Sequence, residues 1–266
     1  MSRRFRIVAV GWGALMRHAA ALMAERLPQV EIVGVAVRDP AERDDLPPGA
    51  RVLNGPEDLP AGFADLVIEA AKADAVEPWG QAALARAGGF APLSISAFTT
   101  DGVLARLVAV AEQHGTHLLI PSGAIGAVDA LRAASFAGLD SVRHEIVKPL
   151  AAWRGTEAEA LIGPGAQGPV RFLTVSAREA ARRFPLNANV AALVALCGIG
   201  LDATEVTLTA DPAATCNSHI ITATGAFGRF SIRLDNKPVP NNPKSSALTA
   251  LSIVRLVEAQ SAAVRW

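Results

Sequence analysis

Two glycines near the amino terminus have the spacing of a turn that binds phosphate. Gly11 and Gly13 follow the apolar run at residues 5–10 and stand just before a helical stretch that begins at Ala14. The first glycine permits a tight turn, the second lets the backbone approach a pyrophosphate, and the helix start offers free amides to an anion. Met16 stands where a third glycine or an alanine is usual. The pattern predicts dinucleotide binding through Gly11, Gly13 and Ala14; the alternative is an ordinary turn between a strand and a helix.

The residues after the second apolar run would select between two nicotinamide cofactors. Arg38 and Asp39 stand side by side where the expected strand at residues 31–37 ends. An acidic residue at this point can bind the ribose hydroxyls of NAD, whereas an arginine can pair with the 2'-phosphate of NADP. Because the chain has both, the choice between NAD and NADP stays open. Solvated loop charges are the alternative for both residues.

One of the five histidines stands where acid-base chemistry could use it. His219 opens an expected strand, directly after Asn217 and Ser218. A histidine gains or loses a proton near neutral pH, which suits a general acid or base. The histidines at positions 18, 114, 117 and 144 are expected to be structural.

Other kinds of site are excluded by the residue types. The chain has no tyrosine, so no mechanism can use a phenol as acid or base. Its two cysteines, Cys197 and Cys216, have no CxxC spacing, and the histidines have neither HxH nor HExxH spacing. We therefore expect neither a disulfide scaffold nor a metal site.

The elements that must position these residues follow two different patterns. The first half alternates apolar runs with helical stretches, which is typical of a parallel sheet covered on both faces, in a doubly wound α/β topology. From about Ser122 the runs alternate in polarity, so an α+β domain with a half-exposed sheet is expected. Its hairpin pairs residues 218–224 with 227–234 around Gly225, and Pro243 would begin the final helix. The expected strands of the first half are 5–10, 31–37, 65–68, 93–97 and 117–120, with helices at 14–27, 75–87 and 101–114 and a final helix at 245–264.

Composition limits the partners and the location. The 266 residues are 51% hydrophobic, and 25 basic residues balance 25 acidic ones without a basic stripe, so a nucleic-acid partner is not expected. No apolar run reaches the roughly 18 to 20 residues of a membrane span, and the basic start followed by a short apolar run is too short for a signal peptide. We expect a soluble, cytoplasmic protein with a small-molecule partner and no membrane partner.

Several long blocks of unusual composition carry a resemblance. They occur in order over nearly the whole chain: IPSGAIGAVDAL (120–131), KPLAAWRGT (148–156), SAREAARRFPLNANVAA (176–192), ADPAATCNSH (210–219), GAFGRF (225–230) and NNPKSSALTALS (241–252). Together they resemble the L-aspartate dehydrogenase family. The resemblance implies NAD- or NADP-dependent oxidative deamination of L-aspartate to iminoaspartate, which water converts to oxaloacetate and ammonia, and a link to NAD biosynthesis.

The resemblance also implies an organisation and a set of site residues. A Rossmann-type dinucleotide-binding domain would comprise residues 1–121 and 241–266, with the last helix packing back on it. A catalytic and dimerisation domain with a mixed sheet would comprise residues 122–240 and form a homodimer. His219, in the NSH triplet, matches the family's catalytic histidine, and Ala124 and Asn189 match its cofactor contacts.

Aspartate has two carboxylates, which need cations or amide donors if they are to be held in place. Lys148, Arg154 and Lys244 lie inside the family-like blocks and are the candidate cations, although each could be a surface charge. Ser122 and Gly123, at the end of an expected strand, could add donors.

Two alternatives remain open from the sequence. One is a related two-domain enzyme acting on another amino or keto acid, such as a relative of homoserine dehydrogenase or dihydrodipicolinate reductase. The other is a nicotinamide-binding sensor that has lost turnover. His219 together with Lys148 argues against the sensor.

Overall fold

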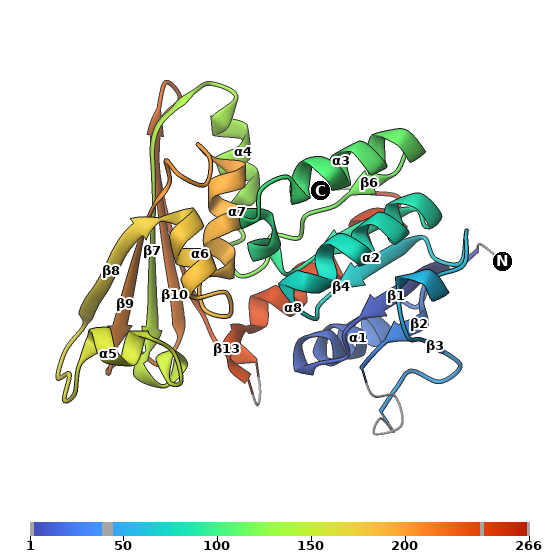
Figure 1. The fold of residues 1–266 in the computed structure, drawn as a ribbon, viewed down its shortest axis with the longest axis horizontal. Coiled ribbons are helices and arrows are strands. Elements are labelled where there is room, and N and C mark those ends of the chain that lie inside the picture. Colours follow the sequence, from blue (N-terminus) through green and yellow to red (C-terminus); the bar gives the residue numbers. More distant parts are fainter. Residues whose placement is uncertain (1–2, 39–44, 240–241, 265–266) are drawn as a thin grey trace. The chain divides into compact units, whose positions relative to one another are not determined.

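The chain forms two compact units in a computed structural model (Figure 1). The structure describes residues 3–38, 45–239 and 242–264. The first unit consists of Met1–Pro121 and Ala250–Trp266, and the second of Ser122–Thr249. The chain thus returns to the first unit later than residue 241, because strand β13 (Asn242–Ser246) pairs with β12 (Pro238–Val239) in the second unit.

A six-stranded parallel sheet forms the centre of the first unit. Its strand order is β3-β2-β1-β4-β5-β6, the order of a doubly wound dinucleotide-binding fold, which confirms the predicted α/β class. Neighbouring strands are parallel throughout. The strands are β1 (Phe5–Val10), β2 (Val30–Ala36), β3 (Arg51–Leu53), β4 (Leu66–Glu69), β5 (Gly89–Pro92) and β6 (His117–Leu118).

Helices cover both faces of this sheet. On one face, α1 (Ala14–Arg26) and α8 (Ala247–Ser261) place Met16, Ile253 and other apolar side chains against Ile7 and Ile68 of the strands. On the other face, α2 (Ala73–Arg86) and α3 (Val103–His114) pack together, with Gly80 of α2 closely approached by Leu107 and Phe90. None of the described helices combines the length and the apolar run required to cross a bilayer.

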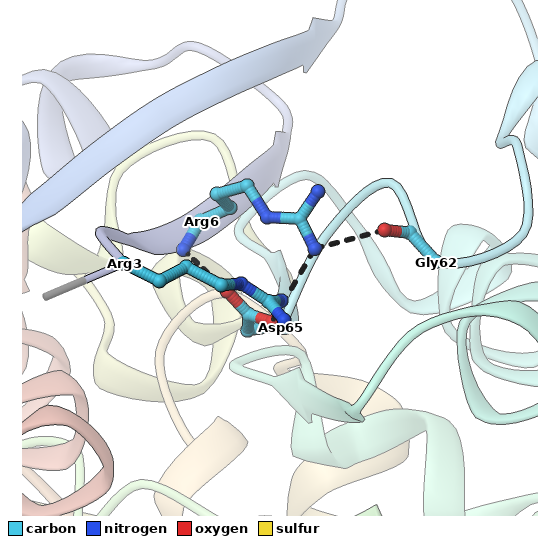
Figure 2. Close-up of polar contacts among 4 residues, drawn as sticks. All are labelled: Arg3, Arg6, Gly62 and Asp65. Carbon is cyan, nitrogen blue, oxygen red and sulfur yellow. Dashed lines mark hydrogen bonds and ion pairs between the residues drawn. The ribbon is translucent and has the colours of Figure 1, made fainter.

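A cluster of charged side chains fixes the start of β1 against β4 (Figure 2). The carboxylate of Asp65, just before β4, accepts a hydrogen bond from the backbone amide of Arg6 at 2.8 Å and pairs with the side chains of Arg3 and Arg6. The guanidinium of Arg6 also donates to the carbonyl of Gly62 at 2.8 Å. These contacts tie both strands together at the edge of the sheet opposite the phosphate-binding turn.

The second unit contains a mixed five-stranded sheet in the order β11-β10-β7-β9-β8. Strands β7 and β9 are parallel, whereas β10 is antiparallel to β7 and β11, and β8 is antiparallel to β9. One face is buried and the other is polar, so the predicted mixed, half-exposed sheet is confirmed. The strands are β7 (Leu139–Pro149), β8 (Val170–Ser176), β9 (Glu205–Asp211), β10 (Asn217–Gly225) and β11 (Gly228–Asn236); the helices are α4 (Val128–Ser135), α5 (Ala158–Ile162), α6 (Ala177–Arg183) and α7 (Asn189–Cys197).

Two local predictions are wrong for identifiable reasons. The strand predicted at residues 93–97 lies earlier, as β5, and residues Ile95–Thr99 form a 3-10 helix. Gly88, directly before β5, has no room for a side chain, because a Cβ there would lie 2.5 Å from the carbonyl oxygen of Asp65. Pro243 lies in β13 and not at a helix start, since α8 begins at Ala247.

The buried carboxylate of Glu69 braces the end of β4. It is 0% exposed and accepts hydrogen bonds from the amide of Ala71 at 2.7 Å, the amide of Ser94 at 3.0 Å and the hydroxyl of Ser94 at 2.8 Å. Burial raises the pKa of this carboxyl, and the hydrogen bonds oppose the rise. Glu69 therefore joins the loops after β4 and β5 at the carboxyl edge of the sheet, where ligands of such folds bind.

Replacing Glu69 should weaken the first unit. In Glu69→Gln, the side-chain amide would face at least one of the three donors, which leaves a buried group unsatisfied and costs about 1–3 kcal/mol. Urea unfolding would measure the free energy of unfolding. Glu112→Gln, on the exposed side of α3, is the matched control and should change little; equal stability of all three proteins would contradict the bracing role.

Gly11 and Gly13 should respond differently to alanine. Gly11 has φ +89°, and a Cβ there would lie 2.9 Å from the carbonyl oxygen of Ala70, whereas a Cβ on Gly13 would meet nothing within 4 Å. Gly11→Ala should cost about 1–3 kcal/mol through backbone strain. Gly13→Ala should cost less than about 1 kcal/mol, the effect of alanine at a helix N-cap. Thermal unfolding of both variants checks this, and equal losses would refute the difference.

Candidate functional site

A pair of histidines lies on the buried face of the second unit's sheet. Nε2 of His144 and Nδ1 of His219 are 3.1 Å apart, and the ring centroids are separated by 5.3 Å. Both side chains are 1% exposed. Nε2 of His219 takes no part in this contact.

The pairing of β7 with β10 produces this contact. His219 lies opposite Ile146, and His144 lies opposite Ile221. Side chains alternate between the two faces of a strand, so positions two apart share a face. His144, Ile146 and Lys148 therefore share the buried face of β7, next to His219.

The electrostatics of this face favour neutral imidazoles. Burial lowers the pKa of His144 to about 3. The pKa of His219 is also lowered, mainly by burial and further by the nearby His144 and Lys148. Lys148 itself is 3% exposed, so a positive charge lies within electrostatic range of His219 inside the unit. Such a face can bind an anion and exchange a proton at the same place.

The residues expected to contact the cofactor in this unit also lie close together. Ala124 is buried, and its carbonyl accepts a hydrogen bond from Nδ2 of Asn236 at 2.8 Å. Asn189 is the first residue of α7, and a Cβ on Gly123 would lie 3.8 Å from the side chain of the next residue, Val190. The loop with Ala124 therefore lies against the start of α7.

The other predicted substrate contacts are less concentrated. Arg154 is exposed just after the turn Leu150–Trp153, and Ser122 is half-buried at the start of the second unit. Lys244 belongs to β13, but its side chain lies outside the described part of the structure. Of the predicted substrate-binding cations, Lys148 is the one that the described side chains place near His219.

In the first unit, the turn between β1 and α1 fits an anionic cofactor. Gly13 is the N-cap of α1, no side chain caps the helix, and its first turn has no acidic residue. The amides of that turn are therefore available to a phosphate, and the open space at Gly13 leaves room for it. Arg38 is exposed beyond the end of β2, and Asp39 lies outside the described residues. NAD and NADP both fit this turn.

Two features of the candidate site are absent from the sequence predictions, one in each unit. In the first unit, Trp12 is buried in the turn, and its Nε1 donates to the carbonyl of Asp45 at 3.0 Å, while Arg17 pairs with the Asp45 carboxylate at 2.9 Å.

In the second unit, the sequence predicts a structural role for His144. Val142, His144 and Ile146 alternate with the polar residues Arg143 and Glu145, which indicates that His144 is buried, but its partner is distant in sequence. Within residues 3–38, 45–239 and 242–264, no cluster of His, Cys, Asp or Glu could hold a metal ion.

Family models match both parts of the chain. Residues 129–260 match "Aspartate dehydrogenase, C-terminal", and residues 11–121 match "Homoserine dehydrogenase, NAD binding domain". The fold is similar to that of aspartate dehydrogenase from Thermotoga maritima, with a TM-score of 0.80 and 24% identity over 99% of this chain and 100% of that one.

Relatives of known family match almost the full length of the chain. An L-aspartate dehydrogenase of Ruegeria pomeroyi is 41% identical over 267 residues, which cover 98% of this chain and 94% of the relative. An L-aspartate dehydrogenase of Brucella anthropi is 50% identical over 254 residues, which cover 95% of each chain. With this identity along both of its units, the chain belongs to the L-aspartate dehydrogenase family.

Proposed function

We propose that this chain catalyses the NAD- or NADP-dependent oxidative deamination of L-aspartate, and the reverse reductive amination. The observation that carries the proposal is the 50% identity to an L-aspartate dehydrogenase along 95% of both chains. The buried His219, with Lys148 nearby on the same sheet, supplies chemistry that this reaction needs. With one water consumed, the reaction gives oxaloacetate, ammonium, the reduced cofactor and one proton.

His219 moves the protons of the reaction. The nicotinamide, when bound, supplies the acceptor for the hydride that leaves Cα of aspartate. Before that hydride can leave, the ammonium group of the substrate must lose a proton, and Nε2 of neutral His219 takes it. The lowered pKa of His219 keeps the ring neutral at neutral pH and ready to accept this proton. His219 then passes this proton to solvent, and once neutral it takes a proton from the water that attacks iminoaspartate and returns it to the departing amino group, which leaves as ammonia.

Lys148 binds a carboxylate of the substrate in this proposal. A buried ammonium next to an acid-base group attracts an anion strongly, because few waters screen it. Arg154, Lys244 and Ser122 remain candidates for the second carboxylate. Ala124 and Asn189, near one another in the second unit, and Gly11, Gly13 and Ala14 in the first, bind the cofactor.

The proposal includes an assembly and a location. The polar face of the second sheet carries the ion pairs of Arg143 with Glu205 and of Arg171 with Glu145. On the basis of the family resemblance, we assign the contact between the two chains of a homodimer to this unit. Cys197 and Cys216 are free thiols, which suits a reducing cytoplasm.

Absorbance at 340 nm tests the reaction directly. The purified chain should reduce NAD or NADP with L-aspartate, and should oxidise the reduced cofactor with oxaloacetate and ammonia. Activity with homoserine in place of aspartate would favour the related two-domain enzymes. Cofactor binding without turnover on any of these substrates would favour the sensor.

Loss of the His219 imidazole should slow the reaction without weakening the binding of the cofactor. His219→Ala should lower kcat by roughly 100-fold or more, the usual contribution of a general acid-base group. The dissociation constant for NADH, measured by fluorescence titration, should stay nearly constant. His114→Ala, at the exposed end of α3, is the control. A His219→Ala enzyme that turns over at the normal rate in both directions would remove His219 from the mechanism.

Replacing Arg38 should weaken the use of NADP and leave the use of NAD unchanged. A charge-assisted contact to the 2'-phosphate contributes about 1.5–3 kcal/mol, so Arg38→Ala should raise KM for NADP about 10-fold or more and leave KM for NAD nearly unchanged. Steady-state kinetics with both cofactors measures this. Arg51→Ala removes the same charge from the exposed first residue of β3 and should alter neither value. A similar change for both cofactors would mean that Arg38 does not read the phosphate.

A further inference from the structure

We propose that His144 is a positioning residue that accepts a hydrogen bond from Nδ1–H of His219 and thereby directs the lone pair of His219 to Nε2. The inference rests on the proposed acid-base role of His219. It assigns a function to a buried histidine whose Nδ1 has no hydrogen-bond partner among the described residues.

The distance requires one of the two facing nitrogens to carry a proton. Nε2 of His144 and Nδ1 of His219 lie 3.1 Å apart, within hydrogen-bond range. A neutral imidazole has one N–H and one lone pair, so the partner of Nδ1 decides what Nε2 of His219 presents. If His219 donates from Nδ1, its Nε2 is a base; if His144 donates, Nε2 of His219 carries the proton.

The proposed reaction selects the first arrangement. A general base needs a lone pair at Nε2 before the substrate ammonium is deprotonated. After His219 takes that proton, the imidazolium carries hydrogens on both nitrogens, and Nδ1–H still donates to the same lone pair of His144. The substrate is left as a neutral amine, and the positive charge resides on His219 until the ring passes this proton to solvent. No rearrangement of His144 is needed at any stage.

Burial keeps His144 suited to this task. Its pKa of about 3 leaves the ring neutral at every pH at which the enzyme would work, so its Nε2 lone pair stays available. On the buried face of β7 the other ionisable group is Lys148, whereas Arg143 and Glu145 form ion pairs with β9 and β8 on the polar face. Helix α7 packs on β7, and its ionisable side chain is Cys197, whose thiol pKa is raised by burial.

The arrangement has a cost that points to function. When Nε2 of His144 accepts, its proton lies on Nδ1, which is buried and has no hydrogen-bond partner among the described residues. An apolar side chain of similar size would avoid this unsatisfied donor. Buried polar groups without partners are rare in folded proteins, and a catalytic role is one of the reasons for keeping them.

The tautomer can be read directly by NMR of the full chain labelled with ¹⁵N-histidine. We expect the wild-type spectrum to show His219 protonated at Nδ1 and unprotonated at Nε2, with the assignment taken from the loss of signals in His219→Ala. In His144→Leu the proton of His219 should move to Nε2, the form most common in free histidine. A wild-type His219 that already carries its proton on Nε2 would overturn the proposal.

Kinetics provides a second readout. His144→Leu should lower kcat by roughly 10- to 100-fold, the scale on which groups that orient a catalytic histidine act. KM for aspartate and the dissociation constant for NADH should change little. His144→Gln, whose side-chain oxygen can accept from Nδ1–H, should recover part of the loss. Equal kcat values for wild type and His144→Leu would overturn the proposal.

A matched variant separates positioning from packing. Val142→Ala shortens another buried side chain on the same face of β7 and should leave both the tautomer and kcat unchanged. A loss of kcat in Val142→Ala as large as in His144→Leu would reduce His144 to a packing role. If His219→Ala is fully active, the acid-base role itself fails; if His219→Ala is inactive and His144→Leu is not, only the role of His144 fails.

Discussion

The register between β7 and β10 is the constraint on which the candidate site depends. It places His219 opposite Ile146 and His144 opposite Ile221, so that the two imidazoles meet on the buried face. Side chains alternate along a strand, and a slip of one residue would bring Ser218 and Ile220 to that face and turn His219 toward the polar side. The hairpin of β10 with β11 holds the other edge of β10, and its register is continuous. A long-range pairing, and not a local motif, thus sets the position of the proposed acid-base group.

Burial then determines what these side chains can do. A histidine in water is partly protonated near neutral pH, but His144 and His219 are both 1% exposed and their pKa values are lowered. The neighbouring Lys148 adds a positive charge that further disfavours an imidazolium on His219. An incoming dicarboxylate would offset that charge. The same burial that costs free energy in folding therefore keeps a neutral base ready, and the substrate's own charge then makes its protonation easier.

The parts that sequence could predict are those with a local signal. The run at Phe5–Val10 followed by Gly11 and Gly13 defines β1 and the turn after it, and the alternation on both sides of Gly225 defines the hairpin. The sequence prediction places a strand at residues 93–97, whereas β5 lies at Gly89–Pro92, where a Cβ on Gly89 would lie 3.0 Å from the carbonyl oxygen of His117. The alternation along β7 indicates that His144 is buried, but it gives no sign of the role proposed for it, which depends on a contact with a residue in another strand. Residue type and spacing can suggest a catalytic histidine, but the group that orients it follows from the tertiary pairing.

The two units hold their proposed functional groups in different kinds of structure. In the first unit, the binding surface is made by loops at the carboxyl edge of a parallel sheet, and a carboxylate, Glu69, has to join two of those loops by hydrogen bonds. In the second unit, the proposed acid-base group lies within a strand that is paired on both sides, so the backbone itself fixes it. Binding of a cofactor tolerates small movements of a loop, and Arg38 at an exposed position can vary without disturbing the core. Proton transfer tolerates much less, because a displacement of 1 Å can reduce the rate about 100-fold. Proton transfer is therefore assigned to β10, which is paired on both sides, and cofactor binding to the loops of the first unit.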